Sequence, residues 1–137
     1  MSSTNRPSKA LHIALWVAQV LLALAFLSAG VMKLFTPIDE LVQKMPWAAD
    51  MPVALVRFIG ASELAGGLGM ILPAATRIRP VLTPIAAIGL ITVMVLAMGF
   101  HLTRAEPQAL PVNLALGGLA AFVAWGRLKK APIAPRG

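Results

Sequence analysis

Two charged side chains stand inside one of the long apolar stretches of this chain. Arg57 lies near the start and Glu63 close to the middle of the stretch between Pro52 and Pro73. A charge at membrane depth costs roughly 2.5–3.5 kcal/mol, so it normally faces the interior of a helix bundle and finds a partner there. A carboxyl group in that position is a candidate for relaying protons, anchoring a ligand or fixing the register of the helices.

The spacing of these two charges indicates what each can contact. Arg57 and Glu63 are six residues apart, which places them about 120° apart around a helix. They are therefore poor partners of each other, and each is expected to find its partner on another helix. At a rise of about 1.5 Å per residue, Glu63 lies roughly 16 Å from the start of the helix, close to the middle of a bilayer. Gln19 is the polar residue of the first apolar stretch nearest to this depth. Glu63 is therefore expected to hydrogen-bond to Gln19 or Ser28 if its role is structural.

Further polar side chains are expected on the same side of the membrane as Arg57. Lys33 ends the first apolar stretch, His101 ends the third, and Asn113 begins the fourth. We expect Lys33 to extend to the lipid headgroups, and Arg57 either to do the same or to contact an anion. His101 is either a proton carrier or an ordinary interface residue, and Asn113 is expected to hydrogen-bond to another helix. The candidate site comprises Gln19, Lys33, Arg57, Glu63, His101 and Asn113, with Glu63 as the candidate catalytic residue.

Four apolar stretches can position these side chains, because each approaches the roughly 20 residues that a helix needs to cross a bilayer. The predicted fold class is all-α, a bundle of four transmembrane helices. Residues 33–52 form the longest connection, in which Thr36 and Pro37 precede a short amphipathic helix that either caps the bundle or lies on its surface. Residues 1–10 and 129–137 are basic tails. The four helices are expected at 11–32, 53–72, 81–100 and 110–128.

The composition is that of a membrane protein. Apolar residues make up 58% of the 137 residues and charged residues only 12%, whereas a soluble domain has roughly 45–50% apolar residues. The net charge of +7 is therefore attributed to basic ends beside membrane helices, and nucleic-acid binding is not expected. The absence of cysteine excludes disulfides and thiolate chemistry in this chain, and two widely separated histidines predict no metal site.

The positions of the basic residues predict the orientation in the membrane. Of the 12 basic residues, eight lie on one side, in the two tails, in the loop between the second and third helices and, as Arg127, at the end of the fourth helix; three lie on the other side. Because basic loops stay in the cytoplasm, both termini are expected to be cytoplasmic, in a multi-pass protein of a bacterial inner membrane. A cleaved signal peptide is the alternative for the first stretch, which is longer than the typical apolar core of such peptides.

Two segments carry a resemblance to a known family. Residues 23–35 read ALAFLSAGVMKLF and residues 57–73 read RFIGASELAGGLGMILP. Together with the later histidine and asparagine, they resemble the DoxX-like family of small bacterial four-helix membrane proteins over about residues 11–127. The resemblance implies an inner-membrane bundle and a link to quinones, because the family takes its name from a subunit linked to a thiosulfate–quinone oxidoreductase; other members are associated with oxidative stress complexes. It also implies a polar cluster of Lys33, Arg57, Glu63, His101 and Asn113.

Three classes of function follow from these observations. The first is a small-ligand or quinone-associated subunit, in which the basic side chains and His101 hold polar groups and Glu63 manages a proton. The second is a non-catalytic scaffold or partner subunit, which packs through small residues such as Gly117 and Ala121. The third is a proton-coupled carrier, suggested by a weak repeat between the two halves of the chain. Enzymatic activity is left open; the partners considered are the bilayer, membrane or redox proteins and further copies of the chain.

Overall fold

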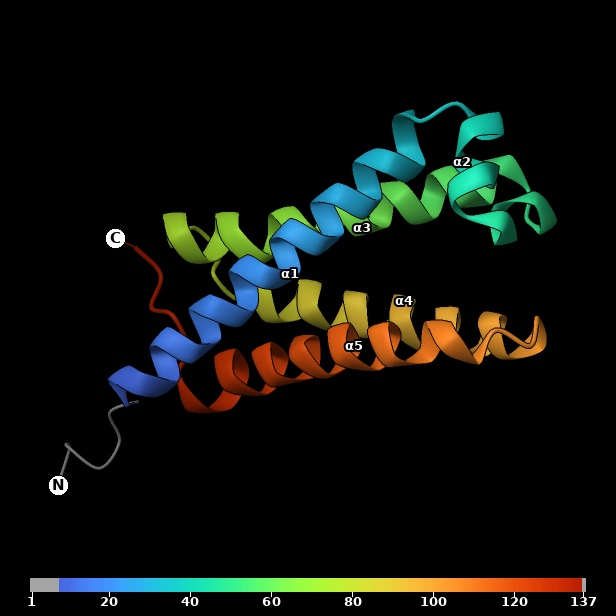
Figure 1. Ribbon diagram of the computed structural model, residues 1–137. Helices are drawn as coiled ribbons and strands as arrows, with labels where there is room; N and C mark the ends of the chain where they lie inside the picture. Colours follow the sequence, from blue (N-terminus) through green and yellow to red (C-terminus); the bar gives the residue numbers. More distant parts are fainter. Residues whose placement is uncertain (1–7, 137) are drawn as a thin grey trace, which may run out of the picture.

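Four long helices carry the chain back and forth along one axis (Figure 1). The computed structural model describes residues 8–136, and within that range it contains helices and no strand. Each long helix, the last one together with its flanking turns, has the length and composition to cross a membrane. The predicted all-α fold with four membrane-spanning helices is therefore confirmed. The long helices are α1 (Lys9–Phe35), α3 (Val53–Thr76), α4 (Leu82–Thr103) and α5 (Leu110–Trp125).

Four short elements complete the fold. The connection between α1 and α3 holds α2 (Ile38–Lys44) and the 3₁₀ helix η2 (Pro46–Asp50), while η3 (Pro107–Ala109) joins α4 to α5. A π-helical turn, η4 (Gly126–Lys130), continues α5. The end of the bundle that carries α2 is named the α2 end, and the opposite end, where α1 begins and the described chain ends, is named the terminal end (Figure 1).

The helices pack in two pairs. The most extensive contacts are between α1 and α3, followed by those of α4 with α5 and of α3 with α4. The contact between α1 and α5 is smaller. Figure 1 shows the reason, because α1 lies beside α5 near the terminal end and diverges from it toward the α2 end.

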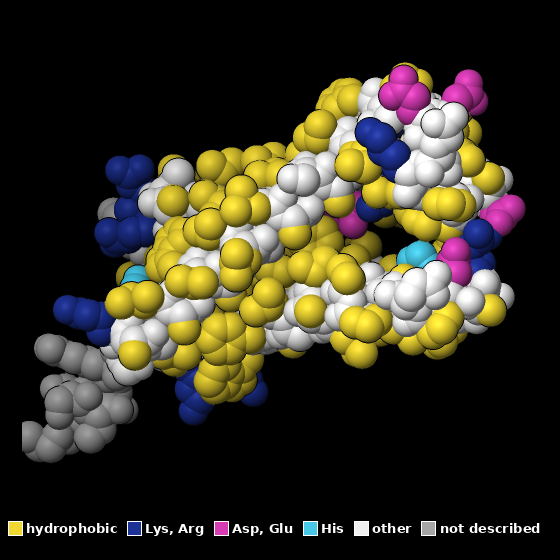
Figure 2. Space-filling view, in the orientation of Figure 1, with side chains coloured by type: hydrophobic (Ala, Val, Ile, Leu, Met, Phe, Trp, Pro, Cys, Tyr) yellow, Lys and Arg dark blue, Asp and Glu magenta, His cyan; other side chains and the backbone are white. Residues whose placement is uncertain are grey.

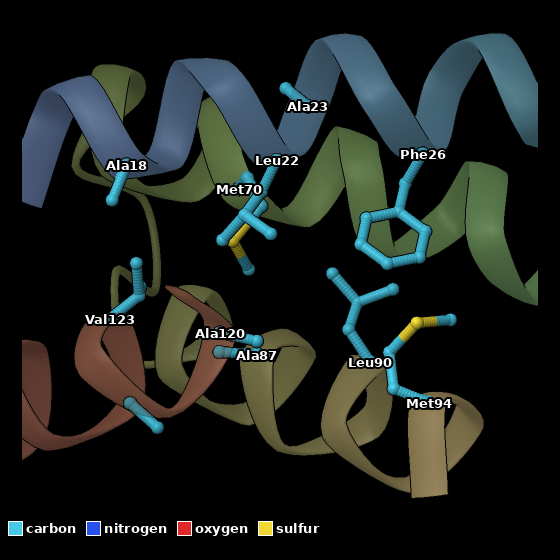
Figure 3. Close-up of a cluster of buried hydrophobic side chains, with 11 residues drawn as sticks. Ala18, Leu22, Ala23, Phe26, Met70, Ala87, Leu90, Met94, Ala120 and Val123 are labelled. Carbon is cyan, nitrogen blue, oxygen red and sulfur yellow. The ribbon is translucent and has the colours of Figure 1, made fainter. Parts of the chain in front are cut away.

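An apolar core joins all four helices where the pairs are closest (Figure 3). Side chains from α1, α3, α4 and α5 form one cluster there. Lipid is as apolar as these side chains, so close packing, more than removal from water, holds the helices together. The largest members are almost fully buried: Leu22, Phe26, Met70, Leu90 and Val123.

Two glycines bring the backbones of α1 and α3 into direct contact. A methyl group at Gly30 would lie 2.7 Å from the carbonyl oxygen of Gly60 and 2.7 Å from the backbone nitrogen of Leu64. Gly66 and Gly67 leave space in the same way for leucine side chains of α4 and α1. These glycines therefore allow the close packing of α3 against its neighbouring helices.

The short helix α2 covers the α2 end of the α1–α3 pair. Its Leu41 is fully buried and forms a small cluster with Ala48 of η2 and Val56 of α3. Met32 at the end of α1 packs against the same cluster. Of the two roles considered for this segment, the structure therefore has the capping role.

Three long helices, α1, α3 and α4, extend beyond the ranges expected from the sequence. Helix α1 begins at Lys9, before residue 11, because the Ser8 side chain accepts a hydrogen bond of 2.9 Å from the backbone nitrogen of Leu11. This contact satisfies one of the donors that a helix start leaves free. The first turn of α1 is therefore fixed by a polar cap ahead of its apolar residues.

Helix α3 passes through Pro73 and ends at Thr76, whereas the expected end was residue 72. Proline has no N–H, so the carbonyl of Gly69, four residues earlier, loses its helical partner. The Thr83 hydroxyl of α4 donates a 2.7 Å hydrogen bond to that carbonyl. This replacement removes the reason for the helix to stop at the proline, and it fixes α4 against α3. The helix ends three residues after Pro73, and the next residue, Arg77, adopts a left-handed conformation.

The contact at Gly30 predicts a large difference between two similar substitutions. Gly30→Ala should lower the free energy of unfolding by about 1–3 kcal/mol, because neither backbone can move away from the new methyl group easily. Gly118→Ala is the matched control, since a methyl group there would meet nothing within 4 Å. Thermal unfolding of both purified variants in detergent tests this expectation. Equal losses of stability would show that the two backbones do not limit the packing.

Candidate functional site

A buried ion pair joins α1 to α3 at the α2 end. The Lys33 ammonium nitrogen lies 2.6 Å from a carboxylate oxygen of Glu63, and their side chains are only 9% and 4% exposed. Gly60 makes space for this lysine, because a methyl group there would lie 2.7 Å from its Cβ. The expectation that Lys33 extends to the lipid headgroups is therefore wrong. An ammonium group remains buried when a carboxylate compensates its charge.

Arg57 completes the end of helix α1. Its Nη1 donates hydrogen bonds of 2.8 Å to the carbonyls of both Lys33 and Thr36. These carbonyls belong to the end of α1, where a helix has unpaired acceptors and a partial negative charge. Arg57 and Glu63 thus both contact α1 with different groups, which confirms that they are not partners of each other. Within residues 8–136, the hydrogen-bond partners of the Arg57 side chain are these two carbonyls.

Trp47 of η2 lies between this ion pair and helix α4. The Lys33 ammonium group is 5.8 Å from the centre of the Trp47 ring, within the range of a cation–π contact. Trp47 also packs edge to face with Phe100 at 6.0 Å and with His101 at 6.2 Å between ring centres. The tryptophan therefore links Lys33 and Glu63 to the end of α4.

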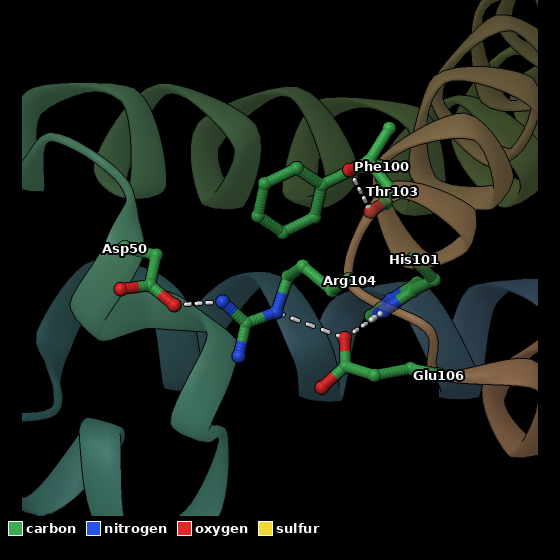
Figure 4. A network of polar contacts seen from close by, with 6 residues as sticks. All are labelled: Asp50, Phe100, His101, Thr103, Arg104 and Glu106. Atoms are coloured by element: carbon green, nitrogen blue, oxygen red, sulfur yellow. Dashed lines mark hydrogen bonds and ion pairs between the residues drawn. The ribbon is translucent and has the colours of Figure 1, made fainter.

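A second polar network joins the α4–α5 connection to η2 (Figure 4). The Glu106 carboxylate interacts with Nδ1 of His101 and with Nε of Arg104, each at 3.0 Å. Because an ionised carboxylate only accepts hydrogen bonds, His101 is the donor in its contact. Arg104 also forms an ion pair with Asp50 of η2. The hydrogen bond from His101, followed by the contacts with Arg104, lowers the pKa of Glu106 below its usual value, although partial burial opposes this effect.

Asn113 lies in the first turn of α5 and is 8% exposed. Among the described residues, its side-chain nitrogen has no hydrogen-bond partner although that atom is buried. The hydrogen bond to another helix that the sequence analysis expected is therefore not made by this nitrogen. Leaving a buried donor without a partner costs about 1–3 kcal/mol.

Gln19 belongs to a different part of the bundle. Its amide nitrogen donates a 2.7 Å hydrogen bond to the carbonyl of Met70, and its oxygen accepts one of 2.7 Å from Nε of Arg127. Met70 follows Glu63 by seven residues along α3, toward the terminal end. The expected contact between Gln19 and Glu63 is therefore wrong, and Ser28, the other partner considered, is exposed.

The surface at the α2 end is hollowed between the two helix pairs. Figure 2 shows this hollow, with acidic, basic and histidine side chains around it. The divergence of α1 from α5 accounts for the space (Figure 1). The α2 end thus combines a buried ion pair, a second set of charged groups, aromatic rings and an opening. This combination suits the binding of a small molecule that has both polar and flat apolar parts.

Two buried charges, Arg127 and Lys33, were not expected from the sequence. Arg127 was assigned to the basic residues on the cytoplasmic side, yet it is only 4% exposed. It follows the buried Val123 by four residues, which is helical spacing for one face. Lys33 likewise follows the buried Phe26 and Gly30 by seven and three residues. This helical spacing from buried residues could have indicated that both charges are buried. It is a better guide to burial than the position of a charge near the end of an apolar stretch.

Comparison with known proteins identifies one family. The model of the DoxX-like family matches residues 17–123. The matched range includes all six candidate residues and excludes Arg127. Searches of curated proteins and of solved structures found no match.

The buried ion pair predicts an asymmetric double-mutant cycle. Glu63→Gln should lower the free energy of unfolding by about 3–5 kcal/mol, because it leaves the Lys33 ammonium group buried without a counter-charge. Adding Lys33→Met to that variant should restore much of the loss, since the remaining groups are then neutral. Unfolding of the single and double variants in detergent measures both effects. Additive losses would contradict a direct ion pair between these residues.

The lowered pKa of Glu106 predicts a specific dependence of stability on pH. The ionised carboxylate favours the folded state, so its stabilisation is present above the usual pKa of 4.5 and is lost as pH falls through the lower folded-state value. Glu106→Gln should therefore lose less stability than the wild type between about pH 6 and pH 3. Glu40→Gln, at an exposed position of α2, is the control and should follow the wild type. Thermal unfolding across this pH range gives the comparison, and parallel curves for wild type and Glu106→Gln would contradict it.

Proposed function

Since this chain belongs to the DoxX-like family and has four membrane-spanning helices, we propose that it is a membrane subunit that binds a small ligand at the α2 end. The proposed ligand class is a quinone. The protein is then a binding and positioning subunit, and a redox protein in the same membrane is its proposed partner. The proposed location is the bacterial inner membrane, with the terminal end in the cytoplasm, because most basic residues lie at that end.

The position of Trp47 is the observation that carries this proposal. Its ring contacts the Lys33 ammonium group of α1 and the rings of Phe100 and His101 of α4. Charged and aromatic groups from two separate helices therefore meet at one residue of η2. A purely structural ion pair between α1 and α3 needs no aromatic link to α4.

The available groups fit the chemistry of a quinone. Its flat ring packs well against aromatic side chains, and its two carbonyl oxygens need hydrogen-bond donors. Asn113 supports this fit, because its buried side-chain nitrogen has no partner among residues 8–136. A ligand carbonyl would provide the acceptor that this donor lacks. The Lys33 ammonium group is a further donor at the same end, because only one of its three N–H groups is needed for Glu63.

A role as a partner subunit without a ligand is the second candidate. Gly118 and Ala121 are exposed on α5, and a methyl group at Gly118 would meet nothing within 4 Å. Small residues on a lipid-facing surface allow another helix to approach closely. Of the two residues expected for this role, Ala121 is exposed. Gly117 faces α4, because a methyl group added there would lie 3.5 Å from Cβ of Met94.

Replacing Asn113 by leucine separates ligand binding from structure. Asn113→Leu removes the unpaired donor at similar size, so the protein without ligand should be as stable as the wild type or more stable. The same change should weaken quinone binding about tenfold, because one hydrogen bond to the ligand is lost. The measurement is the thermal midpoint in detergent during titration with a short-chain benzoquinone and a short-chain naphthoquinone.

Two controls complete this experiment. Gly118→Ala lies on the lipid-facing surface away from the ion pair and should bind the quinones like the wild type. A hydrocarbon with the same chain but no quinone ring should stabilise neither protein. Failure of both quinones to stabilise the wild type would reject the ligand proposal and favour the partner subunit.

A further inference from the structure

Arg127 is a buried cation whose contacts in the described chain are all neutral. It donates hydrogen bonds of 2.7 Å to Oε1 of Gln19 and of 3.0 Å to the carbonyl of Ala131, and its Nη1 lies 3.0 Å from Nδ1 of His12. Its Nη2 is buried and has no partner among residues 8–136. Burying a charge without a counter-charge is costly. The other buried cation, Lys33, has its carboxylate partner at 2.6 Å.

The sequence has no acidic side chain to offer at this end. All five acidic residues lie between positions 39 and 106. On the face drawn in Figure 2, acidic side chains gather toward the α2 end, whereas only basic ones appear toward the terminal end. The counter-charge of Arg127 must therefore come from outside these side chains, and the electrostatic potential at the terminal end attracts anions.

A cavity of about 510 Å³ opens beside this arginine. Its charged lining residues are Arg79 and Arg127, and most of the remaining wall is apolar, with Leu82 and Ile85 of α4 on one side and Ile133 on the other. One wall is thus the start of a membrane-spanning helix, and the other is the chain that follows α5. The cavity therefore combines a basic part with an apolar part.

The chain after α5 is held in place over this cavity. Nε of Arg77 donates a 2.9 Å hydrogen bond to the carbonyl of Ala134, and the backbone nitrogen of Arg136 donates one of 2.9 Å to the carbonyl of Arg77. Arg77 and Arg79 both have left-handed backbone conformations, with φ of 60° and 47°. Such conformations are uncommon for residues with side chains and mark a specific loop shape. With this loop shape, Arg77 contacts the chain that follows α5, and Arg79 lines the cavity.

From these observations we propose that the cavity binds the phosphate headgroup of an anionic phospholipid. Arg79 and Arg127 provide the positive charge, and the apolar wall accompanies the first part of an acyl chain. Basic pockets between membrane helices on the cytoplasmic side commonly hold anionic headgroups. A π-helical turn at the end of α5 is consistent with this role, since such turns are frequent at functional sites. The site is independent of the proposed quinone site, because the two lie at opposite ends of the bundle.

Titration of the detergent-purified protein with defined lipids tests this proposal. Phosphatidylglycerol should raise the thermal midpoint and saturate at one lipid per protein, whereas phosphatidylcholine, with no net charge, should not. Arg79→Gln should weaken phosphatidylglycerol binding about fivefold, as expected for the loss of one cation near a headgroup. Lys129→Gln is the matched control, because this exposed residue is basic but does not line the cavity. Native mass spectrometry counts the lipid bound to each variant.

Further measurements distinguish a lipid headgroup from free phosphate, and a specific site from general attraction to a basic surface. Inorganic phosphate should stabilise the protein much less than phosphatidylglycerol; equal stabilisation at equal concentration would overturn the proposal of a lipid. Equal weakening in Arg79→Gln and Lys129→Gln would show general attraction to a basic surface and would also overturn it. Arg127→Gln should lose most of the binding. Because this buried variant risks misfolding, the decision rests on the exposed Arg79.

Discussion

The close approach of α1 and α3 at Gly30 and Gly60 is the constraint on which the polar groups of the α2 end depend. Only at this backbone separation can the Lys33 side chain lie beside Gly60 and meet the carboxylate of Glu63. The same approach brings Arg57 to the free carbonyls at the end of α1. Packing and electrostatics are therefore not separate contributions here, because small residues create the geometry that makes buried charges tolerable.

The two ends of the bundle differ in whether their buried cations have a carboxylate partner. At the α2 end, Lys33 and Arg104 each have a carboxylate partner, and Trp47 and the hollow lie between these two pairs. At the terminal end, Arg127 is buried among neutral groups. The paired charges beside the hollow at the α2 end suit a neutral polar ligand. The excess positive charge at the terminal end suits an anion. The two proposed sites therefore differ in ligand charge as well as in position.

The sequence was sufficient for the number of membrane helices, because length and apolar content alone decide whether a helix can cross a bilayer. It also predicted that Arg57 and Glu63 would not be partners of each other, since their spacing places them on different faces of one helix. It could not name the partner of Glu63, because this depends on the angle at which α1 crosses α3, and depth alone suggested Gln19. Lys33 and Arg127 were misjudged for a related reason: their position near the end of an apolar stretch was given more weight than their place on the buried face of the helix.

The contact between Gln19 and Arg127 bears on the order in which the helices assemble. Gln19 lies in the first membrane helix and Arg127 after the last one, so 108 positions separate the two partners. During synthesis α1 and α3 are available to each other first, and the carbonyl of Met70 gives the Gln19 amide nitrogen a partner at that time. The oxygen of the same amide gains its partner, Arg127, only after the fourth membrane helix has been synthesised. Its hydrogen bond with the arginine therefore marks the completion of assembly, joining the first helix to the last.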